Sequence, residues 1–227
     1  MRGIAFDVRG SVAHFRRPDT TATQLTYPFI TPTAAKGLVG AILGIEDFVT
    51  ADQVGIELLH PVQTVAQQMS MLGKDPGLTF NRPTTVELLV NPAYRIYYTG
   101  EENTEVLIKA LTEEQTVYAT YLGVAYALTR PVLHKVYSKV EFVMSTGRGI
   151  ESKTVVPTAM IERLIVQPDR YYCRAGGYLR QYRGNRRFEQ SVDFLYEKDG
   201  KPISFVSGEI EIDVQLATFG EDWICLV

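Results

Sequence analysis

Residues 31–44 constrain the fold more than any other segment, because they mark both ends of one helix. Thr31 can cap a helix with its side-chain oxygen, and Pro32 suits the first helical position, where its missing N–H costs nothing. An apolar, glycine-spaced run follows and ends at Gly44. We therefore predict a helix from about Pro32 to Leu43 with one nearly bare side, which can lie close to a sheet or to another backbone.

The residues before this helix predict a strand that leads into a basic loop. Apolar residues alternate with polar ones from Ile4 to Val12, which is the period of a half-buried strand. Arg16 and Arg17 follow, and a polar loop joins them to the helix. The helix N-terminus, with its unpaired N–H groups and positive dipole end, is expected beside this arginine pair. The arrangement predicts a polyanion site, although an ordinary strand–helix unit with a threonine-rich loop has the same pattern.

Composition and charge limit the class of protein. The 227 residues are 45% hydrophobic and 22% charged, as in an ordinary globular protein of one large domain or two small ones. The sequence has neither an apolar run near the 18 or so residues of a membrane span nor a signal-peptide organisation, so we expect a cytoplasmic protein without membrane contact. The two cysteines and three histidines show no metal-binding spacing, and we expect neither metal nor cofactor.

The net charge of −3 is unevenly distributed. Residues 1–44 carry a local charge of +3, residues 163–187 carry +6, and residues 188–227 carry −7. This distribution fits a subunit that holds nucleic acid on one face and proteins on others, although a solvated arginine-rich surface would look the same.

Residues 3–44 also resemble a known family in the order, spacing and type of their residues. The shared run comprises Gly10, His14-Phe15-Arg16-Arg17-Pro18, Thr20-Thr21, Thr26-Tyr27-Pro28-Phe29, Pro32-Thr33-Ala34, Lys36-Gly37-Leu38 and Gly40-Ala41-Ile42-Leu43-Gly44. It resembles the opening of CRISPR-associated protein 5, a family of the RAMP superfamily, and most of all the variants of type I-B systems. Beyond residue 44 the resemblance is loose.

This resemblance implies a non-catalytic RNA-binding subunit of a type I Cascade surveillance complex, which serves antiviral defence. In the family, the subunit caps the backbone filament, grips the 5′ handle of the CRISPR RNA and contacts the large subunit that reads the PAM. The implied partners are the CRISPR RNA, the backbone subunit, the large subunit and target DNA near the PAM. The implied fold is α+β: a ferredoxin-like (RRM-like) domain with a protruding β-hairpin thumb and a small β-rich C-terminal part.

The periodicities along the chain favour the same architecture. After the first strand and helix we predict a long strand at 54–71 interrupted at Pro61, strands at 84–90 and 94–98, a helix at 104–114 and a strand at 132–143. The order strand, helix, strand, strand, helix, strand is that of a ferredoxin-like fold. Residues 118–128 either continue the second helix or form a buried strand.

We expect two domains, at 1–150 and 151–227, with a protruding hairpin pair inserted at about 61–98. Residues 72–83 break the strand pattern and are predicted to be a loop at the tip of this hairpin pair. The second domain consists of short β segments, and residues 197–201 are predicted to be a hairpin turn between two of them.

The resemblance assigns RNA binding to the residues that match the family's run, which are His14, Arg16, Arg17, Thr33, Lys36 and Gly37. Three further candidates join them by position only, because a hairpin tip could stack on or wedge between bases: Leu78, Phe80 and Arg82. An ordinary loop that tucks its apolar residues back is the alternative there. Arg148 is added because glycines flank it in a loop.

The run Tyr171–Phe188 interleaves arginine with tyrosine and is the best general nucleic-acid signal in the chain. Arginine can pair with phosphates and tyrosine offers a stacking surface. A protein–protein surface is the alternative, since the same two residue types are enriched there. A protein-only assembly scaffold therefore remains a second reading of the whole chain.

Catalytic motifs are scarce, and we expect a protein that is not an enzyme. The sequence has no P-loop, no H-E-x-x-H and no nucleophile elbow. Metal-independent cleavage of precursor CRISPR RNA, which one branch of the family performs, is the alternative, with His14, or His134 with Lys135, as acid and base. His14 shares its parity with Ile4 and Phe6, so a partly buried, locally hydrogen-bonded histidine is the competing interpretation. His134 and Lys135 would point to opposite faces of their strand, which is poor placement for joint action.

Overall fold

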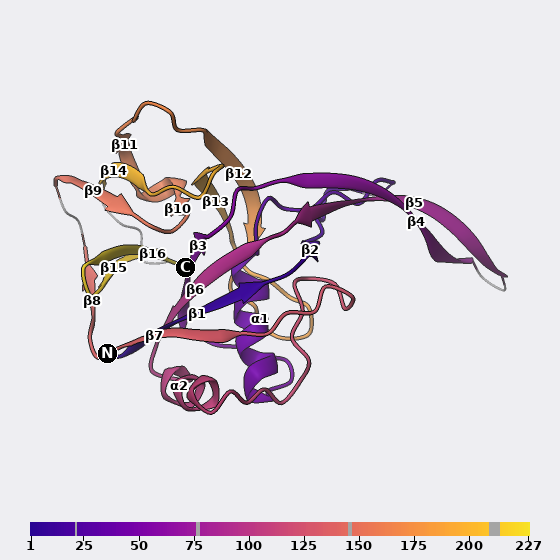
Figure 1. The fold of residues 1–227 in the computed structure, drawn as a ribbon, viewed down its shortest axis with the longest axis horizontal. Helices are drawn as coiled ribbons and strands as arrows, with labels where there is room; N and C mark the ends of the chain where they lie inside the picture. The colour runs from indigo at the N-terminus through magenta and orange to yellow at the C-terminus, as the bar shows by residue number, and fades with distance from the viewer. Residues whose placement is uncertain (21, 76–77, 145–146, 209–213) are drawn as a thin grey trace.

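The computed structural model describes residues 1–20, 22–75, 78–144, 147–208 and 214–227. It consists of a β-rich body and one long hairpin that projects from it (Figure 1). The helices of the described residues are α1 (Pro32–Leu43), α2 (Thr104–Thr112) and the short 3-10 helix η1 (Thr158–Met160). None of them is long and apolar enough to cross a membrane. The strands are β1 (Gly3–Arg9), β2 (Val12–Ala13), β3 (Gln53–Leu58), β4 (Thr64–Asp75), β5 (Leu78–Val90), β6 (Ala93–Thr99), β7 (Val132–Tyr137), β8 (Val140–Val143), β9 (Gly149–Ser152), β10 (Val156–Pro157), β11 (Ile161–Leu164), β12 (Tyr172–Leu179), β13 (Ser191–Glu197), β14 (Ile203–Ser207), β15 (Gln215–Phe219) and β16 (Asp222–Leu226).

A four-stranded sheet in the order β3-β6-β1-β7 carries the two helices. Its neighbouring strands all run antiparallel. Because side chains alternate along a strand, Ile4, Phe6 and Val8 face one side and join the buried residues of α1 and α2 in one core.

The other face of this sheet, which we call the helix-free face, is partly covered by the C-terminal strands. Two glycines permit the close approach: a Cβ at Gly55 would lie 2.6 Å from Ile224 Cγ2, and one at Gly3 would lie 2.6 Å from the ring of Phe219. Tyr97 of β6 packs edge-on against Phe219 at 5.3 Å between ring centres. The covering strands β15 and β16 belong to a six-stranded sheet in the order β11-β14-β9-β16-β15-β8.

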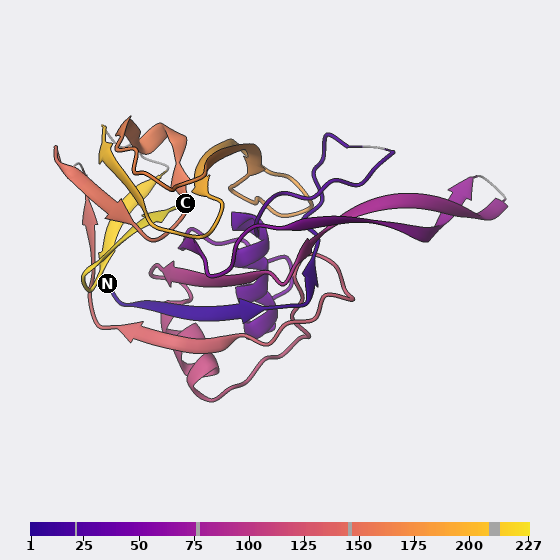
Figure 2. The ribbon, with the colours of Figure 1, turned by 45° about the horizontal axis from the view of Figure 1, so that its top comes forward.

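Two smaller sheets complete the fold. The projecting hairpin is β4 paired with β5 over twelve residue pairs, and the short β2 joins it at its base. The segment between β2 and α1 runs along that base (Figure 2), where the Gln24 amide donates to the Thr85 carbonyl. The other small sheet, β10-β13-β12, contains the first part of the arginine–tyrosine run, in β12.

The helix predicted from Pro32 to Leu43 is confirmed with the same bounds. Thr31 Oγ1 accepts from the Ala34 amide at 3.1 Å, and Pro32 occupies the first turn. Gly44 ends the helix with φ of 74°, a left-handed conformation that glycine adopts without strain.

Several expectations about the strands are wrong. The interrupted strand at 54–71 is two strands, β3 and β4, that belong to different sheets. Residues 72–83 are not a loop, because most of them belong to the paired strands β4 and β5. Residues 94–98 lie in β6, a central strand of the four-stranded sheet, so the projecting segment is shorter than 61–98.

The C-terminal expectations also need correction. Residues 118–128 are neither helix nor strand but turns closed by one bridge between Tyr121 and Leu128. Residues 197–201 do form a turn, but β13 and β14 on its two sides pair in different sheets, so it is no hairpin. Strands from both sides of position 150 share the six-stranded sheet, and the proposed domain boundary does not coincide with a break in the fold.

Candidate nucleic-acid interface

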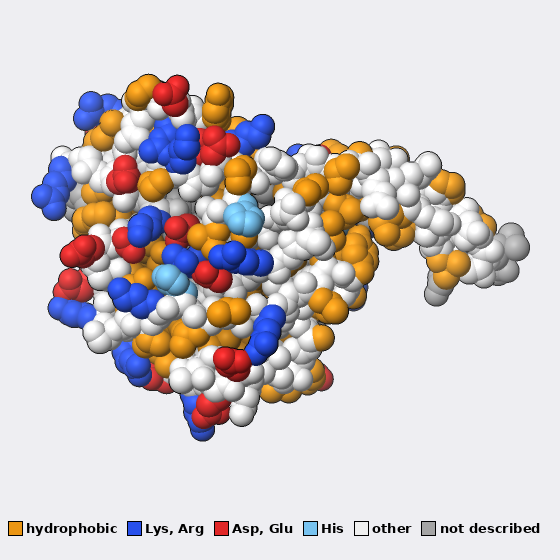
Figure 3. Space-filling model, viewed as in Figure 1, with side chains coloured by type: hydrophobic (Ala, Val, Ile, Leu, Met, Phe, Trp, Pro, Cys, Tyr) orange, Lys and Arg blue, Asp and Glu red, His pale blue; other side chains and the backbone are white. Residues whose placement is uncertain are grey.

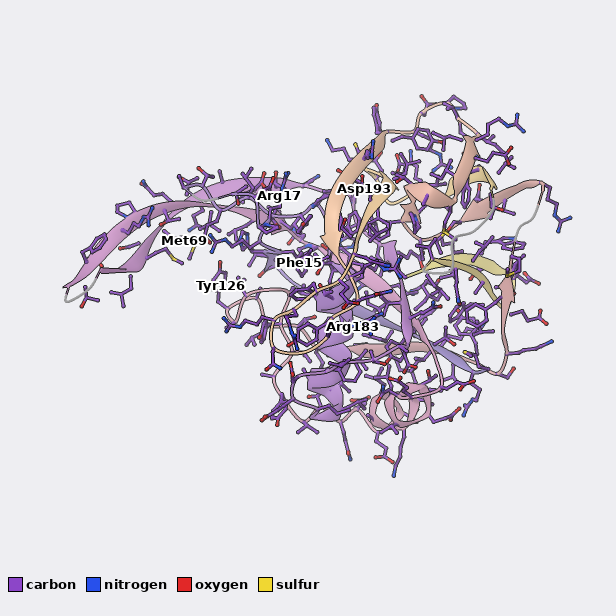
Figure 4. All side chains as sticks on the ribbon, turned by 180° about the vertical axis from the view of Figure 1, so that it is seen from behind. Phe15, Arg17, Met69, Tyr126, Arg183 and Asp193 are labelled. Atoms are coloured by element: carbon purple, nitrogen blue, oxygen red, sulfur yellow. The ribbon has the colours of Figure 1, made fainter. Side chains whose placement is uncertain are left out.

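A polar groove lies between the base of the hairpin and the sheet that contains β12. Its volume is about 870 Å³, and we call it the hairpin groove. The charged residues that line it are Arg17, Glu87, Arg174 and Lys198. Arg17 lies at the base of the hairpin in the view from behind (Figure 4). The lining itself holds three cations and one carboxylate, and exposed cations of this kind can receive an anionic ligand.

Two arginines of the hairpin groove are held in place by carboxylates. Arg17 donates through Nε and Nη2 to Asp19, at 3.1 and 2.6 Å, and this hydrogen bonding raises its pKa. Arg174 Nη2 donates to Asp193 at 2.7 Å. The pKa of Asp193 is lowered, first by the Gly177 amide and then by Arg174. Exposed ion pairs of this kind contribute only about 0–1 kcal/mol, so a phosphate can compete for the guanidinium groups.

Stacked aromatic rings fix the segment that leads from this groove to α1. Tyr178 of β12 lies 4.3 Å from the ring of Tyr27 and 4.9 Å from that of Phe29. The Tyr27 hydroxyl donates to the Gly177 carbonyl at 2.6 Å. The rings therefore anchor the start of α1 against the C-terminal sheet.

A second hollow of about 390 Å³ lies at the N-terminal turn of α1, and we call it the α1 pocket. One helix face supplies Thr33, Lys36 and Gly37, which are three or four residues apart. The rest of the lining includes aromatic and basic residues: Phe48, Arg180, Tyr182, Arg186 and Phe188. Burial, with a further contribution from the charge of Arg180, lowers the pKa of Lys36 to about 8.

On the helix-free face of the four-stranded sheet, a central cluster of charges is paired. Arg95 of β6 donates to both carboxylate oxygens of Asp7, at 2.8 and 3.2 Å, and lies 3.8 Å from a carboxylate oxygen of Glu57. Tyr97 donates to Glu57 at 2.8 Å. Burial raises the pKa of Glu57, against the hydrogen bond from Tyr97 and the charge of Arg95. On the face seen in Figure 3, acidic and basic side chains are interspersed over the body. The Arg95 cluster is therefore neutralised by its own carboxylates.

Comparison with known proteins identifies the family. The family model described as "CRISPR-associated protein (Cas_Cas5)" matches residues 3–174. The chain belongs to this family. The membership of this family that residues 3–44 predicted is thereby confirmed.

Solved structures show the same fold. One is a CRISPR protein from Archaeoglobus fulgidus, with a TM-score of 0.58 and 13% identity over 99% of this chain and 98% of the other. Another is a chain of a CRISPR RNA-guided surveillance complex, with a TM-score of 0.54 and 11% identity over 91% of each chain. No curated protein sequence matches the chain.

The predicted RNA-binding residues do not form one cluster. Arg17 lines the hairpin groove, whereas Thr33, Lys36 and Gly37 line the α1 pocket. Arg16 is exposed and lines neither of them. The helix N-terminus and Arg17 therefore line different hollows, and the helix end shares its hollow with the loop after β12.

His14 is a core residue rather than a contact residue. Its side chain is only 3% exposed, and Nδ1 bonds the Glu87 carbonyl at 2.7 Å. Burial lowers its pKa. The competing interpretation, a buried and hydrogen-bonded histidine, therefore describes it, and its assignment to RNA binding is corrected.

His134 and Lys135 are exposed neighbours on β7, at the edge of the four-stranded sheet. Lys135 Nζ lies 5.0 Å from the ring centre of Tyr137. The pairing of β1 with β7 is irregular here, because Ala5 pairs with Lys135 and Phe6 with Leu133, which leaves His134 without a partner in the ladder. Neither lines the hairpin groove or the α1 pocket.

The hairpin candidates lie away from both hollows. Phe80 is 43% exposed, but its ring lies over Gly73 across the ladder, where a Cβ would be 2.7 Å from it. Arg82 is exposed on β5. Leu78 begins β5, and its side chain lies outside the described part of the structure. The apolar face of the hairpin also contacts the body, where Tyr126 donates to the Met69 sulfur at 3.9 Å (Figure 4).

Arg148 lies in a different place. It lines a hollow of about 430 Å³ beside β9 and β16, together with Lys153, Glu221 and Asp222. These acids make that hollow unlike the two basic ones.

Sequence reasoning missed Lys198 and Phe48. Lys198 was part of a predicted hairpin turn, yet its carbonyl accepts from the Val62 amide near the hairpin base. Phe48 follows α1 in a segment with no periodic signal. Only knowledge of which strands share a sheet could have placed these residues.

Proposed function

We propose that this chain is the non-catalytic RNA-binding subunit of a type I CRISPR RNA-guided surveillance complex of the I-B kind, and that it holds the 5′ handle of the CRISPR RNA in the cytoplasm. The observation that carries the proposal is the hairpin groove, where Arg17, Arg174 and Lys198 line a polar channel. Unpaired RNA needs cations for its backbone and polar partners for its 2′-hydroxyls, and this groove offers both. The surveillance-complex chain of similar fold supports the assignment.

The architecture that goes with this proposal is a ferredoxin-like domain with a thumb. The strand order β3-β6-β1-β7 with α1 and α2 on one face supports the first part. The long β4–β5 hairpin supports the second. The subunit would cap the backbone filament and contact the large subunit and target DNA near the PAM. Exposed apolar side chains between α2 and β7, among them Val117, Tyr118 and Leu128, support protein contacts on that side.

The burial of His14 supports a non-catalytic role. The endoribonuclease alternative has no comparable geometric support.

The test is binding of a labelled RNA with the repeat-derived 5′ handle to the full chain in EDTA, followed by a denaturing gel. We expect saturable binding and intact RNA. The double substitution Arg17→Ala with Arg174→Ala should weaken binding at least about tenfold, because two phosphate partners are removed.

The matched control is Arg2→Ala with Arg130→Ala. It removes the same charge and two exposed ion pairs, to Glu105 and Glu114, outside both hollows. Equal losses in the two variants would contradict a specific groove. A discrete cut in EDTA would contradict the non-catalytic role, and absence of RNA binding would favour the protein-only scaffold.

A further inference from the structure

The α1 pocket has the dimensions of a small-molecule site rather than of a channel. Its volume of about 390 Å³ lies near the lower end of the roughly 300–1,000 Å³ typical of ligand pockets. Such a space accommodates one nucleotide, whereas the larger hairpin groove suits a length of strand.

Its walls offer two kinds of contact. Phe48, Tyr182 and Phe188 present aromatic surface, on which any base can stack. Lys36 and Arg186 supply cations, and the first turn of α1 supplies the positive end of a twelve-residue helix. A nucleotide can use both, because its base can stack on the aromatic rings and its phosphate can pair with the cations.

The aromatic wall is held by its own loop. Asn185 and Arg186 have φ of 50° and 58°, and the Arg187 amide donates to the Gly184 carbonyl, which closes a tight turn. The Tyr182 ring lies 5.1 Å from that of Phe188, and its hydroxyl donates to Asp47. The wall is thus set before any ligand arrives.

Gly37 keeps the helix side of the pocket open. It lies within α1 and is exposed, and a Cβ placed on it would meet no atom within 4 Å. The helix would gain stability from almost any other residue there, since glycine is a poor helix former. We infer that glycine at this position keeps the α1 pocket open.

We propose that the α1 pocket binds one unpaired nucleotide of the RNA, with its base against Phe48, Tyr182 and Phe188 and its phosphate at Lys36 and the helix N-terminus. This inference rests on the proposed function and names a site that the hairpin groove does not include. It assigns to Gly37 the role of leaving room for the ligand.

The experiment is a double-mutant cycle between the protein and the RNA. Handle RNAs with a single abasic nucleotide at each position in turn are bound to the wild-type chain, to Gly37→Leu and to Gly37→Ala. Leucine fills the pocket from the helix side, whereas alanine adds one methyl group to open space. One abasic position should weaken wild-type and Gly37→Ala binding by about tenfold, the size of one stacking contact. Gly37→Leu should bind intact RNA about as weakly and should be insensitive to that same abasic position.

Phe188→Ala provides an independent second variant, since Phe188 is 40% exposed and its removal leaves the core intact. It should show the same insensitivity at the same RNA position. If the wild-type chain binds RNA but no abasic position couples to Gly37→Leu or Phe188→Ala, the pocket inference is overturned and the groove proposal stands. If the wild-type chain binds no RNA, both are overturned.

Discussion

The helix-free face and the hairpin-groove side of this molecule contain the same residue types but use them differently. On the helix-free face, Arg95 is held between Asp7 and Glu57, and the side chains of all three are less than one-fifth exposed. In the hairpin groove, Arg17 and Arg174 pair with the exposed or half-exposed Asp19 and Asp193. The first cluster is structural, because its charges satisfy one another away from solvent. The second keeps its charges accessible to a ligand.

This difference shows that strand order alone does not locate a binding surface. An RRM binds RNA on the open face of its sheet. Here that face is partly covered by β15 and β16, with Gly55 and Gly3 allowing close contact, and Arg95 on it is paired with Asp7 and Glu57. The surfaces left for RNA lie at the hairpin base and at the N-terminus of α1.

The largest expected effect is a loss of stability when the cluster of Arg95, Asp7 and Glu57 is broken. Arg95→Ala leaves Asp7 and Glu57 without their main cation, and we expect a loss of about 2–3 kcal/mol in the free energy of unfolding. Urea unfolding measures it. Arg9→Ala is the control, because the Arg9 side chain is 63% exposed and its contact with Asp7 is long, at 3.8 Å. This substitution should lower the free energy of unfolding by less than about 1 kcal/mol. Equal costs would contradict the structural role of Arg95.

The second prediction concerns salt. Each phosphate contact to a single strand contributes about 0.7 to the slope of log affinity against log salt. Arg17→Ala with Arg174→Ala should therefore lower that slope by about 1.4, as measured by RNA titrations between 50 and 200 mM salt. An unchanged slope would mean that these arginines do not contact phosphates.

A smaller effect is expected from pH. Lys36 in the free protein has a pKa of about 8, with burial as the main cause and Arg180, Asp52 and Glu102 as charged neighbours. An anionic ligand favours the protonated form, so RNA affinity should fall as pH rises from 7 to 9, by up to about tenfold. Lys36→Arg stays charged and should remove this dependence. A wild-type affinity that is constant over this range would contradict a phosphate at Lys36.

The smallest effect is expected on the opposite edge of the sheet. Lys135→Ala removes an exposed cation that lies over Tyr137, outside both hollows. RNA affinity should change by less than about twofold, since charges beyond a Debye length are screened at 0.15 M salt. A loss comparable to that of the groove variant would move the binding surface to β7.

The parts of the fold that could be predicted from the sequence depend on local interactions. The α1 bounds follow from the cap at Thr31 and the turn at Gly44, and α2 from its apolar spacing. Pairing between distant segments could not be predicted in this way. A strand pattern at 54–71 does not indicate that its two halves join different sheets, and the exposed Leu72 and Phe80 resemble loop residues until the β4–β5 pairing is known.

The candidate site shows the same limit. Thr33, Lys36 and Gly37 share one helix face, so their shared pocket follows from helical spacing. His14 could not be placed by parity alone, because its burial depends on Glu87, 73 residues away. Lys198 reaches the hairpin groove only through the long-range packing of β12 and β13.

The most direct test of the account is photo-crosslinking of handle RNA to the full chain, with mass spectrometry of the crosslinked peptides. If RNA lies in the hairpin groove and the α1 pocket, crosslinks will fall in residues 16–37 and 171–198, which supply most of the lining of both. Crosslinks confined to β3, β6 and β7 would place RNA on the helix-free face and contradict it.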